Sequence, residues 1–584
     1  MAYELNGRVS HGGCVGEDKP EKKRFAEHLV LMRVCKPRQE ICRGRKIRKD
    51  RIEAMEEILQ GQGEPEETKT AMGAKEGAAE GTAISGAQEA AAGETAVSGA
   101  QEGTAGEAAA SGTQEGAAGE TAASGTEGAE AEEAAEAVVA GVHNYSDEDV
   151  YVMPEDPWVL KKLEWFKDQK LGLMMHWGPY SQLGIVESWA LSDRDADWSR
   201  EGIDWEVTGE EFKKEYFALN KTFNPLRFEP EKWADLAKEA GMRYLLFTTK
   251  HHDGFCMWDT QYSDYKITAP DCPFHTHKYA DICAHLFESF RKRGIGIAAY
   301  FSKADWHVDS YWKDDTERGK FKSRGPSYRP EENPEEWERF VTFTQNQIRE
   351  LATGYGRLEA MWFDAGWVCP QSGQDIRLGE VIEEVRKVQP GMLCADRTVG
   401  GPYENYVTPE QCVPEKPMTI PWESCITLGT SFSFKYEDVY KSPREVICLL
   451  ADIVVKGGNL AINVGPQPDG RIPAGAVASL KGMGEWLAEY GEAIYGTRIC
   501  APYKKDGIGF TQKDGKVYAI QTFLSETEPV EDEVWIPYAG EFREVTALGD
   551  DKVQSFAGEE GGCRVILERR EHDKAPIARV FCLK

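Results

Sequence analysis

The stretch YLLFTTKHHDG (residues 244–254) joins an apolar run to a polar end that is rich in histidine. A short apolar run bounded by glycine is typical of a buried strand. The preceding stretch PEKWADLAKEAG (230–241) has a proline near its start and a glycine at its end, and it therefore predicts a helix. A helix followed by a buried strand is the repeating unit of an α/β fold.

The same alternation continues on both sides of this unit. Further strands are predicted at 171–178, 295–302, 358–366, 392–397 and 459–466, and further helices at 280–294, 335–356, 378–391 and 443–458. Repeated strand–helix pairs with nearly continuous apolar strands predict a parallel sheet covered by helices. No G-x-G-x-x-G follows the first strand, so dinucleotide binding loses its main support.

Residues capable of chemistry stand at the carboxyl ends of these predicted strands. They are His176, His251, His252, Asp364 and Arg397. A (β/α)8 barrel places its active site at that end of its strands. We therefore predict an α/β chain whose residues 145–499 form a (β/α)8-like catalytic barrel.

Beyond residue 500 the pattern changes to short alternating segments separated by turn residues, such as 516–524 and 532–538. This pattern predicts a small C-terminal β-sandwich over residues 500–584.

The amino-terminal quarter of the chain has a different composition. Of all aromatic residues only Tyr3 and Phe25 precede Tyr145. Residues 1–70 form a basic leader of uncertain structure, and residues 71–144 form an acidic linker of Ala, Gly and Glu in which Ser-Gly recurs every thirteen residues. Such a linker buries too little apolar surface to fold, so we predict a largely disordered tail.

The net charge of −30 limits the choice of partners. About −20 of it falls on the folded part, and an acidic surface disfavours nucleic-acid binding. No apolar run reaches the roughly 18–20 residues of a membrane helix. The amino-terminal sequence lacks the pattern of a secretory signal, so we expect no membrane partner and a cytoplasmic location.

The fourteen cysteines contain no C-x-x-C pair and are expected to be reduced thiols.

Asp364 follows Trp362 by two residues and therefore shares its strand face. A carboxylate beside an indole suits a sugar enzyme, because the aromatic ring stacks on sugar C–H groups. Taken singly, however, a tryptophan indicates core packing and an aspartate at a strand end indicates a helix cap.

His251 and His252 raise the alternative of a metal site. Adjacent strand residues point to opposite faces, so the pair could share an ion only if the strand ends before them. No HxH, HExxH or cysteine set accompanies them. We expect no metal and no cofactor, and we expect the imidazoles to bind sugar hydroxyls.

From about Trp158 to the carboxyl terminus, the chain resembles the α-L-fucosidases of glycoside hydrolase family 29. The matching stretches are 165–181, 223–255, 300–307, 351–367, 456–470 and 491–498. Each stretch alone is weak evidence for the resemblance, but their order and spacing together are specific to the family. The resemblance implies a retaining double displacement by two carboxyl groups about 5–5.5 Å apart.

The resemblance also implies catalytic roles. Asp364 matches the nucleophile, with Ala365 where the family usually has glycine. The acid/base, whose pKa should be raised, is either Glu410 or Glu423. We favour Glu410, because it follows Arg397 by thirteen residues, as in several members of the family.

A fucose pocket follows from the same resemblance. The residues that match sugar contacts are His176, Glu187, Trp189, His251, His252, Tyr300, Trp362 and Arg397. Where many members carry S-W-G-Y, this chain has Ser431-Phe432-Ser433-Phe434, and either phenylalanine could contact the fucose methyl.

The function implied is a retaining exo-glycosidase that hydrolyses terminal α-L-fucosyl residues of oligosaccharides or glycoconjugates through a covalent fucosyl-enzyme intermediate. Two alternatives stay open at this point. One is a retaining glycosidase for a similar sugar such as α-L-galactose, and the other is a catalytically silent carbohydrate-binding protein. Nothing in the sequence indicates an oligomeric state.

Overall fold

The computed structural model describes residues 145–146, 148–192, 196–200, 209–313, 323–569 and 574–584. The predicted leader (1–70) and linker (71–144) lie outside these residues.

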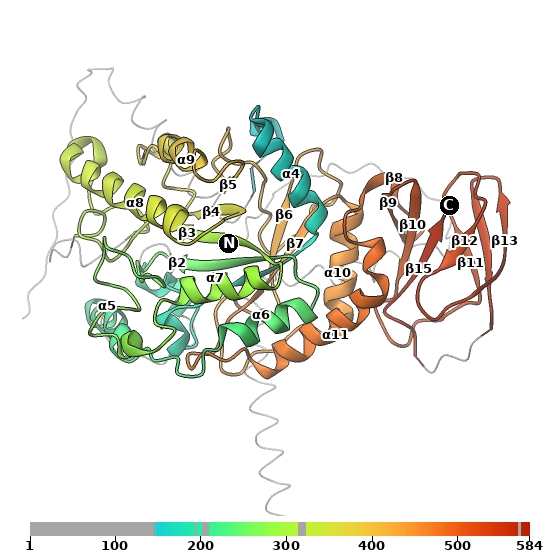
Figure 1. The fold of residues 1–584 in the computed structure, drawn as a ribbon, viewed down its shortest axis with the longest axis horizontal. Coiled ribbons are helices and arrows are strands. Elements are labelled where there is room, and N and C mark those ends of the chain that lie inside the picture. The colour runs from blue at the N-terminus through green and yellow to red at the C-terminus, as the bar shows by residue number, and fades with distance from the viewer. Residues whose placement is uncertain (1–144, 147, 193–195, 201–208, 314–322, 570–573) are drawn as a thin grey trace, which may run out of the picture. The chain divides into compact units, whose positions relative to one another are not determined.

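Seven parallel strands form the central sheet, in the order β5-β4-β3-β2-β1-β7-β6 (Figure 1). Their bounds are β1 Leu171–Met175, β2 Tyr244–Lys250, β3 Gly296–Ser302, β4 Ala360–Asp364, β5 Leu393–Asp396, β6 Glu423–Thr427 and β7 Asn459–Val464. The predicted parallel sheet is confirmed. Strand β6 was not predicted, because its region was expected to be a loop.

The curled sheet is closed by an irregular segment between its two edge strands. Residues 404–410 bridge β5 through Ala395 and Glu404, and they form two parallel pairs with β6 and the residue before it. These pairs join Val407 to Trp422 and Glu410 to Cys425. The segment therefore occupies the place of an eighth strand, as the (β/α)8-like prediction requires.

Eight α-helices are described. They are α4 Pro157–Gln169, α5 Gly209–Phe217, α6 Pro230–Glu239, α7 Ile282–Lys292, α8 Pro334–Gly354, α9 Leu378–Arg386, α10 Pro443–Val455 and α11 Ala474–Tyr490. Local sequence explains several of their starts. Ser442 and Glu445 form a capping box before α10, and the side chain of Asp281 caps α7.

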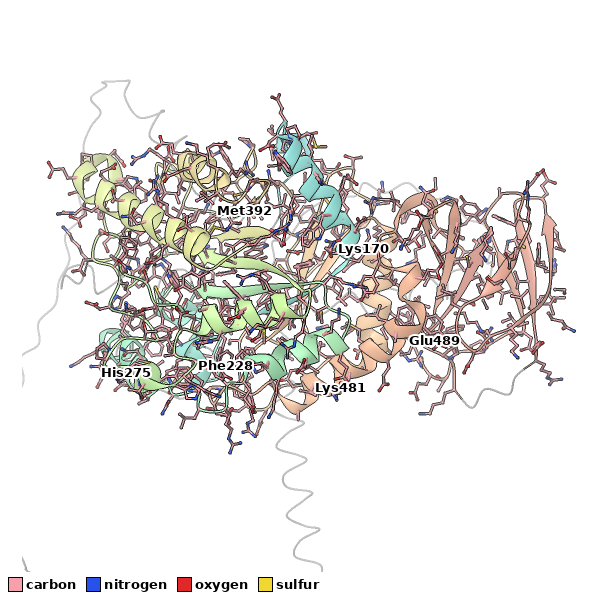
Figure 2. All side chains as sticks on the ribbon, viewed as in Figure 1. Lys170, Phe228, His275, Met392, Lys481 and Glu489 are labelled. Atoms are coloured by element: carbon pink, nitrogen blue, oxygen red, sulfur yellow. The ribbon has the colours of Figure 1, made fainter. Side chains whose placement is uncertain are left out.

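Helix α4 covers the amino-terminal end of the barrel. Phe166 on its inner face stacks on Tyr406 with ring centroids 4.3 Å apart. Lys170, labelled in Figure 2, links α4 to β1 with a left-handed φ of 64°. The side chains of α4 therefore fill the end of the barrel opposite the carboxyl ends of the strands.

The C-terminal part is a β-sandwich, as predicted. One sheet, in the order β12-β15-β10-β9-β8, contains β8 Arg498–Lys505, β9 Ile508–Lys513, β10 Lys516–Thr522, β12 Val545–Ala547 and β15 Ala578–Leu583. The other, in the order β11-β14-β13, contains β11 Glu533–Ile536, β13 Val553–Glu559 and β14 Gly562–Leu567. Residues of β10 and β15 join the barrel's hydrophobic core, so the sandwich packs directly on the barrel.

None of the helices in the described ranges is long and apolar enough to cross a membrane. Every cysteine in those ranges is a free thiol, and most are buried.

Candidate active site

A pocket lies at the carboxyl ends of the parallel strands. The space between its walls, including the part that is open to solvent, is about 400 Å³. Most of the predicted site residues line it, namely His176, Glu187, Trp189, His251, Trp362, Asp364, Arg397 and Glu410. Met174, Cys425 and Phe432 complete the lining.

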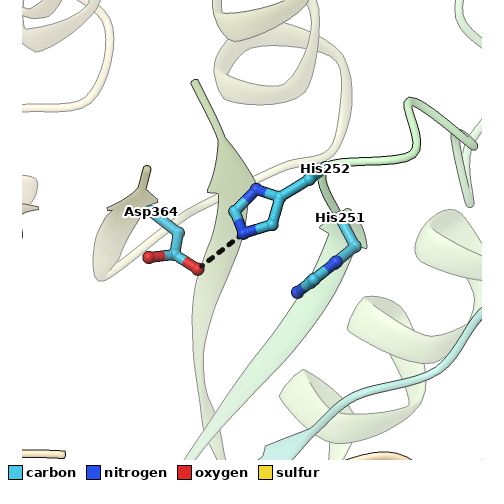
Figure 3. A group of neighbouring side chains, drawn as sticks. All are labelled: His251, His252 and Asp364. Atoms are coloured by element: carbon cyan, nitrogen blue, oxygen red, sulfur yellow. Dashed lines mark ion pairs between the residues drawn. The ribbon is translucent and has the colours of Figure 1, made fainter. Parts of the chain in front are cut away.

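Asp364 is the last residue of β4, and its carboxylate is held from several sides. Oδ1 accepts a hydrogen bond from Arg397 Nη1 at 2.8 Å, and Oδ2 accepts one from the Tyr300 hydroxyl. His252 Nε2 lies 3.6 Å from Oδ2 (Figure 3). Burial opposes ionisation, but Arg397, His252 and the Tyr300 hydroxyl together hold the pKa of Asp364 well below its usual value. Asp364 is therefore ionised at neutral pH, as a nucleophile must be.

Glu410 enters the pocket from the segment that closes the sheet. Its Oε2 accepts a hydrogen bond from Arg397 Nη2 at 2.5 Å. One guanidinium therefore holds Asp364 and Glu410 on its two arms. Sharing one guanidinium therefore places two carboxyl groups at one pocket, as the two-carboxylate chemistry of glycosidases requires.

Glu423 lies elsewhere, because it is the first residue of β6 and the pocket is at the other end of that strand. Its side chain is buried inside the barrel and accepts a hydrogen bond from the Tyr244 hydroxyl. Burial raises the pKa of Glu423 to about 7. Of the two acid/base candidates, the structure brings only Glu410 to the pocket that contains Asp364.

The three histidines are neutral at pH 7, because burial lowers their pKa values. The pKa falls to about 4 for His176 and His252, and well below its usual value for His251. A polar side chain orients each ring through Nδ1: Asn463 at 2.8 Å for His176, Ser188 at 2.6 Å for His251 and Ser302 at 2.7 Å for His252. With Nδ1 engaged, Nε2 is the nitrogen that remains for other partners.

Aromatic rings make up the apolar part of the site. Trp362 stacks on Tyr300 with centroids 5.2 Å apart, and the Arg397 guanidinium lies 4.3 Å from the Trp362 ring centre. Phe432 lines the pocket beside His176, with centroids 5.0 Å apart. Phe434 instead packs on Tyr436 outside the lining. Of the two phenylalanines considered for the fucose methyl, Phe432 is the one in the pocket.

Glu187 is a further buried carboxyl group in the pocket. Its Oε1 accepts a hydrogen bond from the backbone N–H of Ser433 at 2.6 Å. Burial raises the pKa of Glu187 to about 8, so the group is mostly protonated at neutral pH. Ser188, which lies between Glu187 and Trp189, contacts His251 and orients its ring.

His251, His252 and Asp364 have the spacing of a possible metal site, because their ligand atoms lie within 4.8 Å of one another (Figure 3). Strand β2 ends at Lys250, so both histidines can face the same side. Both Asp364 oxygens, however, already accept hydrogen bonds from Arg397 and Tyr300. The positive charge of Arg397 beside the cluster also opposes a cation, so the residues do not fit a metal ion well.

Several residues that shape the site were not predicted. Asn463 could have been found, because it is a polar residue inside the apolar run of β7. Ser302 likewise ends an apolar strand. Cys425 and Ser433 had no comparable signal, because both lie in the region that was expected to be a loop.

The sequence of this chain matches a known family. The family described as Alpha-L-fucosidase matches residues 140–492, which is more than half of the chain. The tissue α-L-fucosidase of Rattus norvegicus is 28% identical over 419 residues, which cover 66% of this chain and 81% of that protein. The human tissue α-L-fucosidase is 28% identical over 380 residues, which cover 61% of this chain and 74% of that protein.

Solved structures are similar as well. The α-L-fucosidase isoenzyme 1 from Paenibacillus thiaminolyticus superposes with a TM-score of 0.59 at 26% identity, covering 73% of this chain and 99% of that one. The Thermotoga maritima α-fucosidase in complex with fucose gives a TM-score of 0.57 at 25% identity, covering 72% and 96%.

Proposed function

Because this chain belongs to the α-L-fucosidases of glycoside hydrolase family 29, which hydrolyse with retention, we propose that Asp364 is its nucleophile and Glu410 its acid/base. The chain is a glycoside hydrolase for terminal α-L-fucosyl residues, and its substrate is a fucosylated glycan. The observation that carries the residue assignment is the Arg397 guanidinium, which binds both carboxyl groups at the pocket.

In the first step, Asp364 Oδ attacks the anomeric carbon as the glycosidic C–O bond breaks. Glu410 donates its proton to the leaving oxygen, and a fucosyl ester of Asp364 forms. In the second step, water attacks the same carbon and gives its proton to Glu410, and Asp364 leaves as a carboxylate. The ionised state of Asp364 in the free site supports this order of events.

Most of the remaining predicted residues bind the sugar, whereas His252 and Tyr300 contact Asp364. The Nε2 atoms of His176 and His251 are placed to hydrogen-bond sugar hydroxyls, and protonated Glu187 offers both a donor and an acceptor. Trp362 offers its ring to the C–H groups of the sugar. Substrates are terminal fucosyl groups of oligosaccharides or glycoconjugates.

The activity is tested with p-nitrophenyl α-L-fucoside, with the reaction followed by proton NMR. We expect p-nitrophenol release, and we expect α-L-fucose as the first sugar to appear, before mutarotation, because two inversions at one carbon restore its configuration. β-L-Fucose as the first product would overturn the retaining mechanism. Absence of release at any pH would favour the silent sugar-binding alternative.

A second prediction separates fucose from α-L-galactose, which carries a hydroxyl on the C6 methyl. Phe432 offers only an apolar surface to that methyl. We expect kcat/KM for p-nitrophenyl α-L-fucoside to exceed that for the α-L-galactoside by about 10²-fold. Phe432→Ala should reduce this ratio by about tenfold. Phe434→Ala is the matched control, and an equal change in both variants would contradict the assignment.

We also propose that residues 145–499 are the catalytic unit and that residues 500–584 stabilise it. Arg444 at the start of α10 donates hydrogen bonds to the backbone carbonyls of Phe523, Ala575 and Pro576, which ties the sandwich to the barrel. The cytoplasmic location and the absence of nucleic-acid and membrane partners remain predictions.

A further inference from the structure

A segment just before the barrel lies across the loop that carries Arg397 and Glu410. This segment, which we name the strap, comprises residues 145, 146 and 148–151. The backbone carbonyl of Val150 accepts a hydrogen bond from Gly401 N at 3.0 Å, and Tyr151 forms a parallel bridge with Gly401. The Tyr151 hydroxyl donates to the backbone carbonyl of Asn405 at 3.1 Å.

Two further contacts hold the amino-terminal half of the strap. Ser146 Oγ donates a hydrogen bond to Glu404 Oε2 at 2.6 Å. Glu148 Oε2 accepts a hydrogen bond from Thr419 N at 3.1 Å. The strap is thus attached to the loop at four places along its length, although it contributes nothing to the pocket lining.

Glu404 is the central residue of this contact. Its side chain is buried, with a residue exposure of 1%. Oε1 accepts a hydrogen bond from Thr398 N at 3.1 Å, and Oε2 accepts one from Gly400 N at 2.7 Å as well as that from Ser146. A buried carboxylate needs such partners, because a buried polar group without a hydrogen bond destabilises the fold.

The turn that Glu404 holds, residues 398–401, has an unusual backbone. Thr398, Gly400 and Gly401 all have positive φ values, of 60°, 76° and 80°. A threonine in the left-handed region is strained, so the turn depends on the contacts around it. Glu404 supplies such contacts from inside the loop, and the strap supplies them from outside.

This turn also touches the catalytic residues. It begins immediately after Arg397. Gly366, two residues beyond Asp364, packs so closely on Thr398 that a Cβ at 366 would collide with the threonine hydroxyl. On the far side of the turn, residues 404–410 run back to the pocket and carry Glu410. A displacement of the turn therefore moves Glu410 relative to Asp364.

We propose that the strap and Glu404 are positioning elements of catalysis, which fix the 398–401 turn and thereby hold Glu410 in position relative to Asp364. This inference rests on the proposed role of Glu410 as the acid/base. It assigns a function to residues that neither line the pocket nor contact the sugar.

The test compares Ser146→Ala with wild type in the full-length chain on two aryl α-L-fucosides. The p-nitrophenyl leaving group departs without protonation, whereas the phenyl leaving group needs the acid. A misplaced acid should lower kcat/KM for the phenyl fucoside by about tenfold and leave that for the p-nitrophenyl fucoside within about twofold. Tyr151→Phe, which removes the hydroxyl that donates to Asn405, should also lower the ratio of kcat/KM for the phenyl fucoside to kcat/KM for the p-nitrophenyl fucoside.

Ser442→Ala is the matched control. Ser442 Oγ also donates to a glutamate, Glu445, at 2.7 Å, but it does so at the start of α10 and away from the pocket. Removal of this cap should lower the melting temperature and leave the ratio of kcat/KM for the two substrates unchanged. A loss in Ser146→Ala that is equal for both substrates, or no loss, would overturn the proposal.

Glu410→Ala is measured in parallel, so that the two proposals can fail separately. If Glu410→Ala selectively loses the phenyl fucoside and neither strap variant does, the strap proposal alone is wrong. If Glu410→Ala shows no selectivity, the acid/base assignment is wrong, and the strap proposal fails with it.

Discussion

Replacing Asp364 by glycine should lower kcat/KM for p-nitrophenyl α-L-fucoside by at least about 10⁴-fold, because the attacking oxygen is removed and no other ionised carboxylate can take its place. Glu410 lies on the other arm of Arg397 and serves the leaving group. Glu187 is mostly protonated at neutral pH, since burial raises its pKa to about 8. The measurement is a steady-state assay together with a thermal melt to confirm folding.

Azide makes the test of Asp364 specific. In Asp364→Gly, an azide ion can occupy the space of the carboxylate and displace the aglycone directly. A single displacement inverts the configuration, so the product should be β-L-fucosyl azide. Asp452→Asn is a suitable control, because Asp452 is also ion-paired, with Lys456 and Lys504, but lies on α10 away from the pocket. If Asp364→Gly keeps activity within about tenfold of wild type, Asp364 is not the nucleophile.

Much of the barrel could be predicted from local sequence, because its strands are buried on both faces. Strands β1, β2, β3 and β7 form nearly continuous apolar runs, and such runs need no tertiary information to be recognised. Strand β6 is the exception. Its five residues, ESCIT, include a charged and two hydroxyl side chains, and their burial depends on partners that are distant in sequence, such as Tyr244.

The same reasoning explains which site residues could be found. His176, His251, His252 and Asp364 follow recognisable strands, and the carboxyl ends of parallel strands meet at one edge of the sheet. Glu410 and Glu423 could not be separated by sequence, because both lie in the region without a recognisable strand. The two glutamates differ in their position along β6. Glu423 is the first residue of this strand, while Glu410 pairs with Cys425, which lies two residues further along the strand and nearer the pocket.

The strap had no sequence signal at all. Its contacts with the 398–401 turn and with residues 404 and 405 join residues about 250 positions apart. They mainly use backbone groups and one short serine–glutamate hydrogen bond. Neither hydrophobic periodicity nor a motif encodes such contacts. The sequence therefore predicts a start of the folded part near residue 145 but does not indicate what that start does.

Replacing Glu410 by alanine should produce a loss that depends on the leaving group. We expect kcat/KM for the phenyl fucoside to fall by about 10²–10⁴-fold, the usual contribution of general acid catalysis, and that for the p-nitrophenyl fucoside to fall much less. The first step still proceeds with a good leaving group, because Asp364 is intact. The second step becomes slow, because no base activates water, so the fucosyl-enzyme should accumulate and be visible as a burst of p-nitrophenol.

Azide should restore turnover of Glu410→Ala, because it attacks the fucosyl-enzyme without a general base. Two displacements retain the configuration, so the product should be α-L-fucosyl azide, the opposite anomer to that from Asp364→Gly. Glu423→Ala is the decisive comparison, because its carboxyl group is buried beneath the pocket against Tyr244. It should lose stability and show neither azide rescue nor dependence on the leaving group. If Glu423→Ala is rescued by azide and Glu410→Ala is not, the roles of the two glutamates must be exchanged.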